Sequence, residues 1–169
     1  MNITDTTPTE SNLSGLDRKD FQKNINSRKT DLYILKNALG MEVAVTNYGC
    51  AILSIMVPDK NGKFANVILG HDSIEHVINS PEPFLSTTIG RYGNRIANGK
   101  FTLYGEEHQL TVNNGPNSLH GGPTGFHARV WDAVQPNEST VIFNYTSADG
   151  EEGFPGTLEV EMTYRLEDE

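Results

Sequence analysis

The sequence predicts an all-β fold, and three observations support that class. Apolar and polar residues alternate along several short stretches, which is the period of a strand with one buried and one wet face. Sixteen glycines and eight prolines are spread through the 169 residues, which indicates many turns between short elements. No stretch shows the apolar spacing of a helix of convincing length.

The N-terminal third predicts a leader followed by strands. Residues 1–24 are polar and lack periodicity, so we expect a polar N-terminal leader that lies over a domain formed by residues 25–169. Residues 41–46 alternate and predict a half-buried strand with one wet face. The apolar run 51–57 suits a strand covered on both faces, and the Pro and Gly of segment 58–62 predict a turn after it.

The middle of the chain predicts shorter elements. Residues 66–69 read as a strand, and residues 71–79 as a helical turn with Ser73 as its cap. Residues 101–104 and 109–112 are expected to form the two arms of a hairpin around Gly105. The Gly-, Asn- and Pro-rich stretch 113–129 predicts a long ordered loop, and such loops often carry function.

The most regular strand is the last one. Strands are also expected at 131–134 and 141–145. Leu158, Val160, Met162, Tyr164 and Leu166 then alternate without error with polar residues. Such a strand needs a partner on at least one side, so either it pairs with earlier strands or the sheet is incomplete at its C-terminal end.

Charge and cysteine content exclude several classes of function. With 22 acidic and 13 basic side chains the formal charge is −9, which argues against nucleic acid and against an anionic membrane surface as partners. No apolar run is long enough to span a membrane, and the polar start shows no secretory signal. The single cysteine, Cys50, reads as an inert buried thiol, and a cytoplasmic location is expected.

Two segments carry the candidate chemistry. Residues 90–99 place two arginines and two asparagines between glycines; this is either a turn cluster or a site where Arg and Asn side chains bind a polar ligand. Residues 113–122 place His120 before two glycines, so this imidazole is either a surface group or a hydrogen-bonding or proton-shuttling one. His76, His108 and His127 read as surface residues, and the histidine spacing does not indicate a metal site.

Several motifs follow one another along the chain, beginning with Asn47-Tyr48-Gly49 and including the two segments above. Gly90-Arg91-Tyr92-Gly93-Asn94-Arg95-Ile96 is followed by Asn117-Ser118-Leu119-His120-Gly121-Gly122, and then by residues 147–156, which read SADGEEGFPG. Over roughly residues 30–166 the chain resembles the aldose 1-epimerase, or galactose mutarotase, family. The resemblance implies a large antiparallel β-sandwich.

The resemblance also implies an activity and a set of residues. The family interconverts the α and β anomers of free aldoses such as galactose and glucose, by acid–base ring opening and without a cofactor. Asn94 and Arg95 match sugar-binding positions, and His120 matches an active-site histidine that contacts the sugar near its ring oxygen. Arg91 is expected to support the loop.

The resemblance covers only the N-terminal half of the family pattern. The family's general acid, a second histidine, and its catalytic base, a C-terminal glutamate, lie in segments that residues 1–169 do not contain. Three alternatives follow: part of a longer mutarotase, a non-catalytic carbohydrate-binding module, or a site that a second chain completes. In each of them the expected ligand is a small-molecule aldose.

Overall fold

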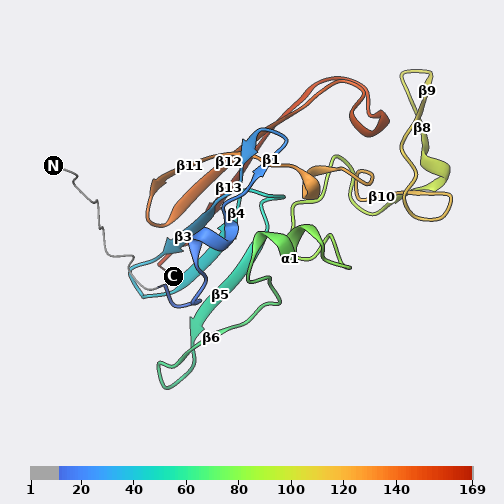
Figure 1. Cartoon of the computed structure of the whole chain (residues 1–169). Coiled ribbons are helices and arrows are strands. Elements are labelled where there is room, and N and C mark those ends of the chain that lie inside the picture. Colours follow the sequence, from blue (N-terminus) through green and yellow to red (C-terminus); the bar gives the residue numbers. More distant parts are fainter. Residues whose placement is uncertain (1–11, 169) are drawn as a thin grey trace.

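Two antiparallel sheets packed face to face form the centre of the structure, which confirms the predicted all-β class (Figure 1). The computed structural model describes residues 12–168. The first sheet has the strand order β3 (Leu32–Lys36), β4 (Glu42–Thr46), β5 (Ile52–Pro58) and β6 (Phe64–Asn66). The second has the order β11 (Asp132–Asn137), β12 (Thr140–Ser147) and β13 (Leu158–Arg165).

Shorter elements surround the two sheets. They are the hairpins β1 (Asn24–Ile25) with β2 (Arg28–Lys29) and β8 (Lys100–Leu103) with β9 (Glu106–Gln109), the pair β7 (Arg95–Ile96) with β10 (Ser118–Leu119), the helix α1 (Ile74–Ile78), and 3-10 turns at Arg18–Phe21, Ala97–Gly99, Phe126–Ala128 and Glu151–Gly153. The Ser73 hydroxyl accepts the His76 N–H at the start of α1, as predicted. The prediction that the second arm of this hairpin lies at 109–112 is wrong. The arm is β9, because Tyr104-Gly105 alone makes the turn. The strand expected at 66–69 likewise lies earlier, at β6.

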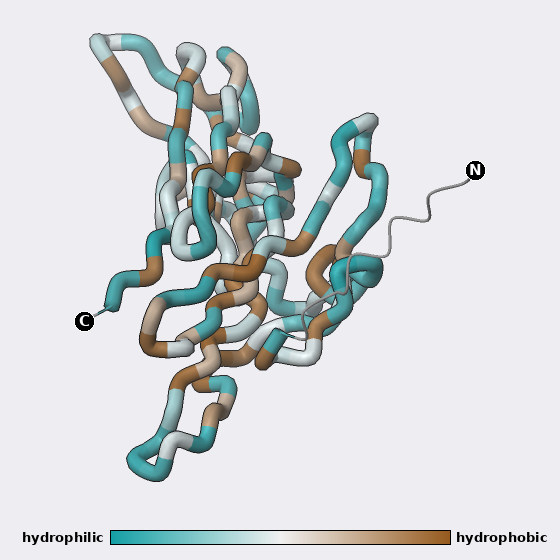
Figure 2. Tube along the Cα trace, turned by 90° about the vertical axis from the view of Figure 1, so that its left-hand side faces the viewer, coloured by the Kyte–Doolittle hydropathy of each residue, from teal (hydrophilic) through white to brown (hydrophobic). Residues whose placement is uncertain are grey.

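The core between the sheets is built by alternate residues of both. Leu35 and Val45 from the first sheet meet Val141 and Phe143 from the second, and Trp131 closes the end of this cluster. All five side chains are almost fully buried. Apolar segments therefore gather in the middle of the molecule, and hydrophilic ones mark the projecting loops (Figure 2). No helix within residues 12–168 is long and apolar enough to cross a membrane.

The outer face of the first sheet is covered as well, so the wet face predicted for residues 41–46 is wrong. Phe21 and the α1 residues Ile74 and Val77 pack there against Ala44. Glu42, which faces the same way, is buried, and its carboxylate accepts the backbone N–H groups of residues 13 and 14 at 2.9 and 3.1 Å. Two consecutive backbone N–H groups, distant from Glu42 in the sequence, thus supply the hydrogen bonds that make a buried acid tolerable. The covering segments are distant in sequence, so strand periodicity alone could not reveal them.

The strand β13 shows the predicted alternation from Glu159 onward, whereas Leu158, which was expected on the buried face, is 41% exposed. Val160, Met162 and Tyr164 are half-buried against the central core, and Glu159 and Glu161 are exposed. All eight residues of β13 pair with β12, and the Tyr164 hydroxyl donates to the carbonyl of Cys50 in the turn between β4 and β5. Within residues 12–168 no strand pairs with the other edge of β13. This strand is therefore an open edge of the second sheet.

The prediction that His127 is a surface residue is wrong, because the side chain is buried. Only 5% of it is exposed, because Gly49 lies against its backbone and Phe84 packs edge-on against its ring at 4.6 Å. Burial, reinforced by the nearby imidazole of His120, lowers the pKa of His127 to about 4. The folded protein therefore holds this ring neutral at pH values where the unfolded chain protonates it.

This burial predicts a pH dependence of stability. Between about pH 6.5 and 4 the unfolded state binds a proton at His127 that the folded state does not bind, so the free energy of unfolding falls as the pH falls, by up to about 3 kcal/mol. Urea unfolding at steps from pH 7 to 4.5 measures this slope. The variant His127→Phe, which cannot titrate, is expected to show a shallower slope than the wild type. Equal slopes for the two proteins would contradict the assignment.

Candidate functional site

Strand pairing brings together the two segments that the sequence singled out. β7 and β10 are antiparallel, with Leu119 opposite Arg95 and Ser118 opposite Ile96. The pairing places Asn94 directly beside His120 at the end of this two-stranded ribbon. Residues 26 positions apart in sequence thus form one polar group.

Asn94 and His120 hold each other through two hydrogen bonds. The backbone N–H of Asn94 donates to Nδ1 of His120 at 2.9 Å, and the backbone N–H of His120 donates to the Asn94 carbonyl at 3.0 Å. A backbone N–H can only donate, so Nδ1 must be an unprotonated acceptor and the neutral ring carries its proton on Nε2. Phe84 packs edge-on against the same ring, with 4.8 Å between centroids. The half-buried imidazole is therefore a fixed hydrogen-bond donor through Nε2.

Arg95 presents its guanidinium beside this pair. Its Nε donates to the Asn114 side-chain oxygen at 2.9 Å, and Nη1 donates to the Asn94 side-chain oxygen at 3.2 Å. Among residues 12–168 no protein atom accepts a hydrogen bond from Nη2, and the side chain is exposed. Both partners are neutral amides, so the positive charge of Arg95 is oriented without being neutralised.

Asn114 is a site residue that the sequence did not identify individually. It lies in a run of turn-forming residues, where an asparagine is ordinary. Only the pairing of β7 with β10 shows that its side-chain oxygen lies within hydrogen-bonding distance of Arg95.

Arg91 turns away from this group and supports the neighbouring loop, as predicted. Its Nε donates to the Ser147 hydroxyl at 2.9 Å, and its other nitrogens donate to the carbonyls of Ser147, Ala148 and Pro155 at 2.9 to 3.0 Å. This one side chain thus ties the 90–99 segment to both ends of the 147–155 loop.

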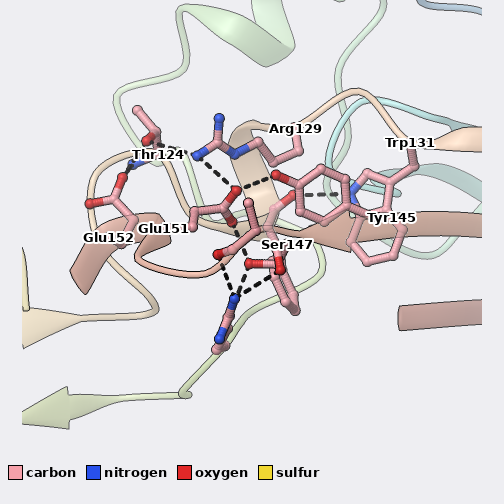
Figure 3. A network of polar contacts seen from close by, with 10 residues as sticks. Thr124, Arg129, Trp131, Tyr145, Ser147, Glu151 and Glu152 are labelled. Carbon is pink, nitrogen blue, oxygen red and sulfur yellow. Dashed lines mark hydrogen bonds and ion pairs between the residues drawn. The ribbon is translucent and has the colours of Figure 1, made fainter. Parts of the chain in front are cut away.

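Glu151, which lies in that loop, is the centre of a network of polar contacts (Figure 3). Its carboxylate accepts the hydroxyls of Tyr145 and Ser147 and pairs with Arg129, whose Nη2 lies 3.4 Å away. Burial, and then the bond to Glu151, raise the pKa of Tyr145 to about 12. The network connects β12 to the loop carrying Arg129, and nothing in the sequence beyond a run of acidic residues indicates it.

An apolar hollow adjoins Arg95. It measures about 450 Å³ and is lined by Arg91, Tyr92, Arg95, Ile96, Phe101 and Phe154. Aromatic faces next to a guanidinium suit a ligand with both C–H and hydroxyl surfaces. Phe126 and Trp131 do not line this hollow and belong to the core between the sheets.

Comparison with known proteins gives the same family at several levels. The family model for aldose 1-epimerase matches residues 31–169. Galactose mutarotase from Bos taurus is 42% identical over 127 residues, which are 75% of this chain and 36% of that protein. Aldose 1-epimerase from Escherichia coli (strain K12) is 41% identical over 138 residues, or 82% of this chain and 40% of that protein.

Solved structures share the fold. An aldose epimerase homologue from C. elegans has a TM-score of 0.78 and 31% identity, and the match covers 82% of this chain and 42% of the other. Galactose 1-epimerase from Lactobacillus acidophilus has a TM-score of 0.75 and 30% identity, over 86% and 43%. The chain therefore spans less than half the length of these relatives.

The family model covers residues 31–169, two relatives are more than 40% identical, and the fold is shared. These findings show that this chain belongs to the aldose 1-epimerase family.

Proposed function

We propose that this chain binds a free aldose through Asn94, Arg95 and His120, as one part of an enzyme that interconverts the α and β anomers of sugars such as galactose and glucose. The observation that carries the proposal is the joint placement of three donor side chains at one ribbon end, with His120 held in a single tautomer. Sugar hydroxyls need donors in fixed positions, and family membership supplies the reaction class.

The geometry favours one role for His120. Ring opening of a hemiacetal requires a base for the anomeric hydroxyl proton and an acid for the ring oxygen. His120 already carries its proton on Nε2 and has Nδ1 occupied, so it acts by donating a hydrogen bond to the ring oxygen region and not as the base. The base and the principal acid are then expected from family segments that residues 1–169 do not contain.

A non-catalytic carbohydrate-binding module is the second candidate function. The site offers donors from Asn94, Arg95 and His120, and the described residues place no carboxylate against them. Such a site binds a sugar without moving its protons.

The binding proposal predicts the effect of removing Arg95. Arg95→Ala is expected to weaken D-galactose or D-glucose binding about tenfold, because a charged donor to the sugar is lost. Isothermal titration of the wild type, Arg95→Ala and the matched control Arg165→Ala measures the difference; Arg165 is the last residue of β13 and pairs with Glu167. Equal affinities for the wild type and Arg95→Ala would show that Arg95 does not contact the sugar.

Polarimetry separates the enzyme from the binding module. Freshly dissolved α-D-galactose is expected to mutarotate at its spontaneous rate in the presence of this chain alone, because the proton acceptor is missing. A clear acceleration that His120→Ala abolishes would show instead that these residues complete the catalytic site.

We also propose that a second polypeptide completes the second sheet at the open edge of β13. The support is the unpaired edge and the half-covered apolar face of Val160, Met162 and Tyr164, since exposed edges of this kind recruit strands. Mixing this chain with the C-terminal remainder of the Escherichia coli relative is expected to give a stable complex that accelerates mutarotation. Two components that elute separately and stay inactive would refute this pairing.

A further inference from the structure

The loop that carries His120 has an unfavourable backbone conformation. Three consecutive residues, His120, Gly121 and Gly122, have φ of 54, 87 and 97°. Backbone in this region is strained for a residue with a side chain and persists only where the surroundings hold it. Asn94 and Phe84 hold the imidazole itself, so the question is what holds the turn that follows it.

Glu152 packs against Gly122 in that turn, and Figure 3 shows its carboxylate bound to Thr124, two residues further on. Its Oε1 accepts the backbone N–H of Thr124 at 2.9 Å and also accepts the Thr124 hydroxyl. A β-carbon at Gly122 would lie only 2.6 Å from Oε2, so the carboxylate lies flat against the glycine backbone. Hydrogen bonds to a carboxylate are the stronger kind, and here two of them end on one residue four positions after His120.

The direction of Glu152 is itself fixed by backbone. Its φ is 51°, between Gly150 at 80° and Gly153 at 87°, and its carbonyl accepts the Thr111 N–H at 3.0 Å. A side chain at positive φ is unusual, and such residues concentrate at functional sites. The conformation aims the carboxylate at the His120 turn instead of at solvent.

The two neighbouring glutamates divide the contacts between them. Glu151 binds Tyr145 and Ser147 on β12, and Glu152 binds Thr124. Arg129 joins the two halves, since its Nη2 lies near Glu151 and donates to the Thr124 hydroxyl at 3.3 Å. A continuous set of contacts therefore runs from the second sheet to the loop of His120.

We propose that Glu152 is a positioning residue for His120. Its carboxylate holds the Gly122–Thr124 turn and so keeps Nε2 of the imidazole directed toward the aldose. The second half of this statement rests on the proposed function, whereas the ordering of the imidazole does not.

The test replaces Glu152 by glycine, which removes the carboxylate and accepts a φ of 51° without strain. Tyr104→Gly is the matched control, because Tyr104 has the same φ of 51° and is 98% exposed at the tip of the β8–β9 hairpin. Glu152→Gln keeps an oxygen acceptor and is the conservative rescue.

Two readouts are needed. The nitrogen chemical shifts of the His120 imidazole report its tautomer, and we expect Glu152→Gly to move them toward the average of the two neutral tautomers. Galactose affinity is expected to fall about tenfold in the same variant, because a small displacement of a positioned donor is costly. Glu152→Gln and Tyr104→Gly are expected to stay within about twofold of the wild type.

The outcomes separate this inference from the proposed function. Unchanged imidazole shifts in Glu152→Gly overturn the positioning role, whatever the sugar affinity. Moved shifts together with a wild type that binds no aldose support the positioning and overturn the proposed function. If Glu152→Gly does not fold, Thr124→Val, which removes one of the two contacts to the carboxylate, takes its place; unchanged shifts in it also overturn the proposal.

Discussion

The candidate site depends on a close approach of two backbone segments at Gly90. The Gly90 carbonyl accepts the Phe126 N–H, and a β-carbon at Gly125 would lie 2.7 Å from that carbonyl oxygen. A β-carbon at Gly121 would overlap it, and one at Gly90 would overlap the Phe126 ring. The two segments can pack so closely only because all three positions are glycines, which have no β-carbon. Because they do, Asn94 and His120 meet, and the 147–155 loop comes within reach of Arg91.

The sandwich supplies a rigid support for that contact. Trp131 donates from Nε1 to the Phe126 carbonyl at 3.2 Å and packs against Phe126 and Tyr145. The same aromatic cluster therefore belongs both to the core between the sheets and to the base of the site. The site thus rests on the part of the molecule where the least motion is expected, since buried aromatic clusters open only with the whole domain.

Local patterns predicted the fold class and singled out the two polar segments of the candidate site without deciding their role, and they failed wherever a distant segment decides burial. The period of β13 and the Ser73 cap are local features, and the structure has both. The predictions for residues 41–46 and for His127 were wrong because Phe21, α1 and Phe84 cover these residues from elsewhere in the chain. Asn114 and Glu152 gain their contacts only through pairing and loop packing, so composition showed them as ordinary turn residues. The family resemblance brought Asn94, Arg95 and His120 into one list, but their mutual geometry needed the coordinates.

Cys50 has a consequence for how the molecule reacts with small reagents. It is the only cysteine of the chain, it is fully buried between the sheets, and burial raises the pKa of its thiol. Alkylating reagents attack the thiolate, so they reach this atom only when the sheets separate. The rate at which a maleimide consumes the thiol therefore counts opening events of the sandwich, and a ligand or partner that stabilises the closed form slows the reaction in proportion.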